Sequence, residues 1–112
     1  MVHELEQNRD RMRVLIRELA YLHSPDEPFT LASGRLSPHF FDMKPVMMNP
    51  ECAHILGVLI HQIIEDTGGV DAIGGLELGA VPLTGIVIAK SGKGSDLRGF
   101  IVRKEPKGRG GR

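Results

Sequence analysis

The sequence predicts an α/β fold built around a parallel sheet. In its second half, segments with helical periodicity alternate with short apolar segments typical of strands. We expect helices over residues 49–68 and 82–91, and strands at 70–75 and 97–102. Strands that are separated by helices pair in parallel through right-handed crossovers. The length of 112 residues and the 41% apolar content fit one soluble domain with a single core.

The first half predicts one amphipathic helix followed by short strands. Apolar side chains repeat at helical spacing from Met12 to Leu22, which indicates a helix over residues 5–22. The prolines of segment 24–28 end it. Residues 29–31 and 39–41 then read as strands around a turn at 33–35.

Helix boundaries in the second half have local signals. Asn49 can accept hydrogen bonds from free amide groups, and Pro50 suits the first helical position. Gly68 and Gly69 end this helix. Pro82 is expected to open the next one.

Charge and cysteine content exclude several functions. Fourteen acids balance fourteen Lys and Arg, so no global field favours nucleic acid or an anionic membrane. Cys52 is alone, which rules out an internal disulfide and favours a reducing compartment; we expect a small buried hydrophobic side chain. The charged start is unlike a signal peptide, and no apolar run approaches about 20 residues. We therefore expect a cytoplasmic protein.

The turn from Gly74 to Pro82 is a candidate anion site. It follows a strand and precedes a helix, and ligands bind at such turns in open α/β sheets. Backbone amides around Gly79 and Ala80, with the helix N-terminus, suit a phosphate. The alternative is a tight turn without a ligand.

The segment after the last strand is strongly basic. Arg103, Lys104, Lys107 and Arg109 lie within seven residues. Cations so close repel one another unless solvent or a polyanion screens them. A loop of this kind can close over a diphosphate; the alternative is a solvated tail. A nucleic-acid tail is disfavoured because no aromatic residues are interleaved.

Phe40 and Phe41 form a third candidate. Neighbouring strand residues point to opposite faces, so one ring can enter the core while the other stacks on a planar ligand. The alternative is that both are structural.

Together, these three segments resemble orotate phosphoribosyltransferases. The family pattern F-x-L-x-S-G-x-x-S-P-x-[FY]-F-x matches FTLASGRLSPHFFD at residues 29–42. The G-x-x-x-G-A-V-P turn and the segment GFIVRKEPKG at 99–108 follow in the family's order.

The resemblance implies a type I phosphoribosyltransferase fold. It divides the chain into a hood and orotate-pocket segment at 1–48 and the first part of the α/β core with the basic loop at 49–112. It also implies transfer of a phosphoribosyl group from phosphoribosyl pyrophosphate (PRPP) to orotate, with Mg²⁺, in pyrimidine biosynthesis.

Site residues follow from the same resemblance. Phe40 and Phe41 match the aromatics beside orotate, and Gly79 with Ala80 form the pyrophosphate turn. The family's pyrophosphate-binding cations correspond to Arg103, Lys104 and Lys107. In relatives the loop carrying Lys107 reaches the neighbouring subunit, which implies a homodimer with shared active sites.

Three departures from the family pattern bear on catalysis. Ala32 stands where a lysine is usual, and Lys44 is the candidate substitute. Gly79 replaces a frequent lysine. Arg109 replaces the loop's histidine; it keeps a charge but cannot donate a proton near pH 7. The resemblance implies that Lys107 and Arg109, which lie on this loop, are the catalytic candidates.

The acidic, Thr/Gly-rich loop that holds the ribose phosphate in the family has no counterpart in these residues. We therefore expect an incomplete fold that is inactive by itself. Two alternatives are a purine salvage phosphoribosyltransferase and a non-catalytic nucleotide-binding or regulatory module.

Overall fold

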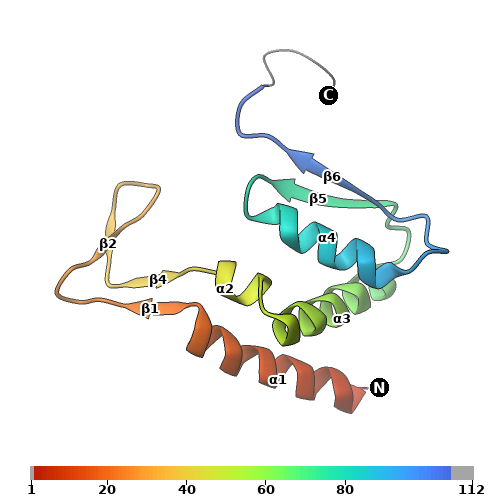
Figure 1. Cartoon of the computed structure of the whole chain (residues 1–112), viewed down its shortest axis with the longest axis horizontal. Coiled ribbons are helices and arrows are strands. Elements are labelled where there is room, and N and C mark those ends of the chain that lie inside the picture. The colour runs from red at the N-terminus through yellow and green to blue at the C-terminus, as the bar shows by residue number, and fades with distance from the viewer. Residues whose placement is uncertain (1, 107–112) are drawn as a thin grey trace. The chain divides into compact units, whose positions relative to one another are not determined.

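The structure, a computed structural model, describes residues 2–106. The chain falls into two compact units, residues 1–52 and 53–112. Figure 1 shows the course of the chain through both. Among the described residues, no helix combines the length and apolar character needed to cross a membrane.

Helix α1, Val2–Leu19, opens the first unit. It buries Met12 and Leu15, as its periodicity predicts. The predicted end at residue 22 is wrong, because Tyr21–His23 forms strand β1. Residues 21–23 pair antiparallel with strand β4, His39–Phe41. Pairing with a distant strand therefore overrides the helical spacing of Leu22.

Both predicted short strands are present, but they do not pair with each other. Strand β2, Phe29–Thr30, pairs with β3, Leu36–Ser37, which the sequence did not predict. The turn between them contains Gly34, whose φ of 87° lies in the left-handed region that glycine tolerates. The segment is thus two small antiparallel pairs rather than one hairpin.

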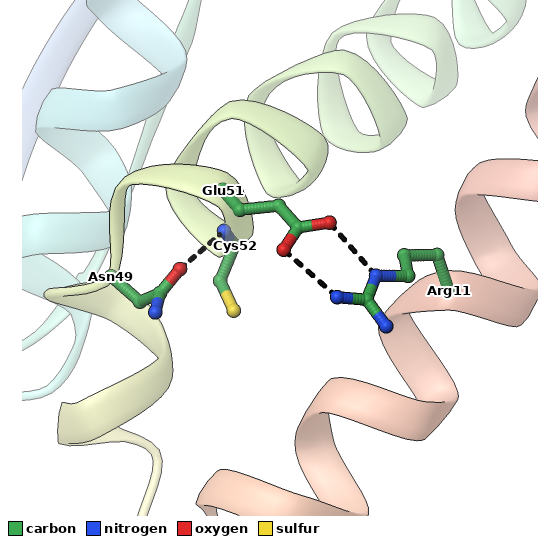
Figure 2. A network of polar contacts seen from close by, with 4 residues as sticks. All are labelled: Arg11, Asn49, Glu51 and Cys52. Atoms are coloured by element: carbon green, nitrogen blue, oxygen red, sulfur yellow. Dashed lines mark hydrogen bonds and ion pairs between the residues drawn. The ribbon is translucent and has the colours of Figure 1, made fainter.

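Helix α2, Lys44–Met47, leads into α3, Pro50–Thr67. The predicted cap is confirmed, since Asn49 Oδ1 accepts a hydrogen bond from the Cys52 amide at 3.0 Å (Figure 2). Glu51 in the first turn forms a two-bond ion pair with Arg11 of α1, at 2.8 and 3.0 Å. Cys52 is fully buried, as expected, and burial raises the pKa of its thiol. These contacts fix the start of α3 against α1.

The second unit contains the predicted parallel sheet. Strand β5, Ala72–Leu76, pairs in parallel with β6, Arg98–Val102, and α4, Ala80–Ser91, connects them (Figure 1). Helix α4 begins two residues before the predicted Pro82. Gly68 and Gly69 both have positive φ and end α3 where the sequence indicates.

Glycines let α4 lie close on the sheet. A Cβ on Gly75 would stand 2.7 Å from the Ala80 Cβ, and one on Gly99 would stand 2.9 Å from the Thr84 Cγ2. Both distances are shorter than real side chains adopt. The absence of side chains at Gly75 and Gly99 therefore lets α4 pack closely on both strands, with Ala80 at its start lying against the carboxyl end of β5.

Candidate functional site

The turn between β5 and α4 is open at the helix N-terminus. Gly79 is the N-cap of α4, and a Cβ placed there would meet no atom within 4 Å. The Val81 amide donates to the Leu78 carbonyl at 3.0 Å. Free amides of a first helical turn, with the positive end of the helix dipole, favour an anion. The predicted role of Gly79 and Ala80 is therefore compatible with their placement.

Glu77 joins this turn to the basic segment after β6. Its backbone N–H donates to the Val102 carbonyl at 2.8 Å, and its Oε1 accepts a hydrogen bond from the Lys104 backbone N–H at 2.8 Å. Lys104 and Arg103 thus start at the same end of the sheet as Gly79. Two of the three predicted segments are brought together in this way.

A cleft of about 760 Å³ lies beside this junction. Its walls come from the turn, from α4 and from β6, and they include Glu77, Leu78, Val81, Thr84 and Arg103. Clefts of roughly 300–1,000 Å³ hold small ligands in other proteins. Arg103 gives the rim a positive charge.

The predicted orotate-pocket residues lie in the first unit. Phe40 and Phe41 are 40% and 57% exposed, so the expectation that one enters the core is wrong. Each ring instead packs against another aromatic: Phe40 against Phe29 at 5.6 Å between centroids, and Phe41 against Tyr21 at 5.3 Å. A strand this short, at the surface, leaves part of both rings accessible.

Lys44, the candidate substitute for the lysine absent at position 32, is exposed at the start of α2. Its Nζ lies 2.9 Å from Asp42 Oδ1. Hydrogen bonds from Lys44 hold the pKa of the Asp42 carboxyl below its usual value. An anionic ligand would therefore compete with Asp42 for this ammonium group.

Lys107 and Arg109 lie outside the described residues. The sequence reasoning missed Glu77, although a signal was present. It is the one ionisable residue in a turn predicted to bind an anion, and an acid there conflicts with that role unless its carboxylate has another partner. Lys104 provides that partner.

The second unit is thus an α/β structure in which an open turn at a helix N-terminus and a basic segment meet at the carboxyl ends of parallel strands, where open α/β sheets bind their ligands. Known relatives define the class further. The orotate phosphoribosyltransferase of Bradyrhizobium sp. strain ORS 278 is 50% identical over 84 residues, which cover 74% of this chain and 45% of the relative. No protein-family model matches the chain.

Solved structures similar to this chain are also phosphoribosyltransferases. A phosphoribosyltransferase from Corynebacterium diphtheriae superposes with a TM-score of 0.71 at 26% identity, covering 95% of this chain and 56% of that one. The Mycobacterium tuberculosis orotate phosphoribosyltransferase in complex with PRPP gives 0.65 at 26% identity, covering 87% and 54%.

The chain is therefore a homologue of the orotate phosphoribosyltransferases and has their type I phosphoribosyltransferase fold, which confirms the resemblance seen in the sequence. It spans about half the length of the curated relatives that it matches.

Proposed function

We propose that the protein containing these 112 residues transfers the phosphoribosyl group of PRPP to orotate, giving orotidine 5'-monophosphate and pyrophosphate, in pyrimidine biosynthesis. The observation that supports this proposal most directly is the junction at Glu77. Its hydrogen bonds hold the Arg103–Lys104 segment beside the Gly79 turn. The similar M. tuberculosis enzyme was solved with PRPP, which supports the choice of substrate.

The chemistry of the transfer explains why cations should gather at this junction. As the bond from ribose to pyrophosphate breaks, the leaving group gains negative charge and the ribose gains oxocarbenium character. Positive groups already in place stabilise that charge without reorganisation. We assign this role to the amides around Gly79 and Ala80 and to Arg103, Lys104 and Lys107, with Arg109 as a further cation.

Orotate binding is assigned to the first unit. The accessible parts of Phe40 and Phe41 offer flat apolar surfaces to a planar ring, and Lys44 offers a cation to its carboxylate. Stacking and a charge-assisted hydrogen bond are the interactions such a ligand needs.

In this proposal, Mg²⁺ is bound by the phosphates of PRPP rather than by a site built from the described residues. Within residues 2–106, no group of three or more His, Cys, Asp or Glu side chains could hold a metal ion. The carboxylate of Glu77, which lines the cleft, accepts a hydrogen bond from the Lys104 backbone N–H. Mg²⁺ commonly binds through one or two carboxylates and substrate phosphates. These residues therefore do not form a magnesium site by themselves, and none of the steps assigned here depends on one.

Assembly and location complete the proposal. We infer a cytoplasmic homodimer in which the loop carrying Lys107 serves the partner's site. Mixing two inactive variants of the natural gene product, Lys107→Ala and Phe41→Ala, should restore part of the activity if sites are shared. If mixed dimers of the two variants form but activity is not restored, the active sites are not shared between subunits.

The direct test is an assay of the natural gene product. Purified protein with PRPP and Mg²⁺ should consume orotate, which is followed by its ultraviolet absorbance, and should leave adenine, guanine and hypoxanthine unchanged. The 112 residues alone are the matched control and should show no turnover. Conversion of a purine base without orotate consumption would overturn the proposal.

A further inference from the structure

We propose that Glu77 is a positioning residue for the pyrophosphate end of the site. Its carboxylate holds the Lys104 amide and thereby fixes the first residues of the basic segment beside the Gly79 turn. The inference rests on the proposed function, because it takes the ligand of this junction to be a diphosphate.

The geometry singles out the side chain of Glu77. The ladder between β5 and β6 ends at the pair Leu76 and Val102. The Glu77 backbone extends it by one bond, to the Val102 carbonyl. Only the carboxylate then reaches two residues farther, to an amide 27 positions away in the chain. Without that bond, the described structure shows no hydrogen bond from the turn to Arg103 or Lys104.

The electrostatics indicate that Glu77 contributes to the site by accepting the Lys104 hydrogen bond and that its negative charge does not favour binding. A carboxylate repels a diphosphate placed beside it. An acid in this turn therefore weakens anion binding unless it orders cations that contribute more. Gln keeps the acceptor oxygen and removes the charge, whereas Ala removes both. The two substitutions separate the effects.

The first experiment measures the contact itself, without any ligand. In the natural gene product labelled with ¹⁵N, hydrogen exchange of the Lys104 amide reports whether this amide is held by the Glu77 carboxylate. This exchange should remain slow in Glu77→Gln and become fast in Glu77→Ala. Slow exchange of the Lys104 amide in Glu77→Ala would overturn the proposal.

The second experiment measures binding of inorganic pyrophosphate by calorimetry. Loss of one hydrogen bond predicts that Glu77→Ala binds about threefold to tenfold more weakly. Glu77→Gln should bind at least as tightly as the native protein. Glu105→Ala is the matched control, because it removes an acid from the same segment that makes no side-chain hydrogen bond within residues 2–106; it should not weaken binding.

Each other outcome has a distinct meaning. Equal weakening in Glu77→Gln and Glu77→Ala would show that the charge matters and would overturn the positioning role. A native protein that binds no pyrophosphate, although its Lys104 amide exchanges slowly and Glu77→Ala makes that exchange fast, would overturn the proposed function and with it the ligand assigned here.

Discussion

Replacing Gly74 by alanine should destabilise the parallel sheet. Gly74 lies opposite Phe100 in the register of β5 and β6. A Cβ at this position would clash with the Phe100 carbonyl oxygen and would stand 2.7 Å from two atoms of the Phe100 ring. Real Cβ contacts are at least 3.0 Å long. The ring can rotate, but the carbonyl belongs to the backbone, so the backbone of the paired strands must shift to admit the methyl group.

The magnitude follows from two opposing effects. Forcing an extra methyl group into a packed site costs about 1–3 kcal/mol, and a backbone clash belongs at the upper end. Alanine also restricts the unfolded chain, which offsets up to about 1 kcal/mol. We therefore expect Gly74→Ala to lower the free energy of unfolding by about 2 kcal/mol.

Urea denaturation of the natural gene product, followed by circular dichroism, measures this change. Gly85→Ala is the matched control: a Cβ on Gly85 in α4 meets no atom within 4 Å, and alanine favours a helix by up to about 1 kcal/mol. The control should be as stable as the native protein or more so. A Gly74→Ala protein with native stability would refute the reasoning, since it would mean that the strands do not approach as closely as described.

Three further predictions concern the start of α3. Asn49→Ala should cost about 1 kcal/mol of unfolding free energy in the same assay, because the Cys52 amide loses its acceptor, and Asn49→Asp should retain it. Hydrogen bonds from Arg11 hold the pKa of Glu51 in the folded protein below its ordinary value of 4.5. The Glu51 carboxylate therefore binds a proton more tightly in the unfolded chain than in the folded one. That contribution to stability is present above about pH 4.5 and is lost as pH falls through the lowered value; in urea titrations, the stability difference between native protein and Glu51→Gln should shrink on acidification. Burial raises the pKa of Cys52, so iodoacetamide at pH 8 should modify it much more slowly in the folded protein than in urea, and equal rates would contradict the burial described.

Local chemistry was enough to predict much of this protein. The cap at Asn49, the proline at position 50 and the glycines at 68 and 69 act on neighbouring backbone groups, so the bounds of α3 could be predicted from adjacent residues. The alternation of helix and strand in the second half indicated the parallel pair, because a strand joined to the next by a helix returns in the same direction. The ordered motifs were enough to indicate the family.

Only the tertiary structure decided which distant segments meet. Tyr21–His23 became a strand because β4 offers it a pairing partner, although its spacing is helical. The exposure of both Phe40 and Phe41 followed from that surface pairing. The Glu77 carboxylate found the Lys104 amide because the parallel register brings residues 27 positions apart within 2.8 Å. Periodicity reports how each segment folds by itself, whereas a hydrogen bond between segments depends on a register that is set when they pack.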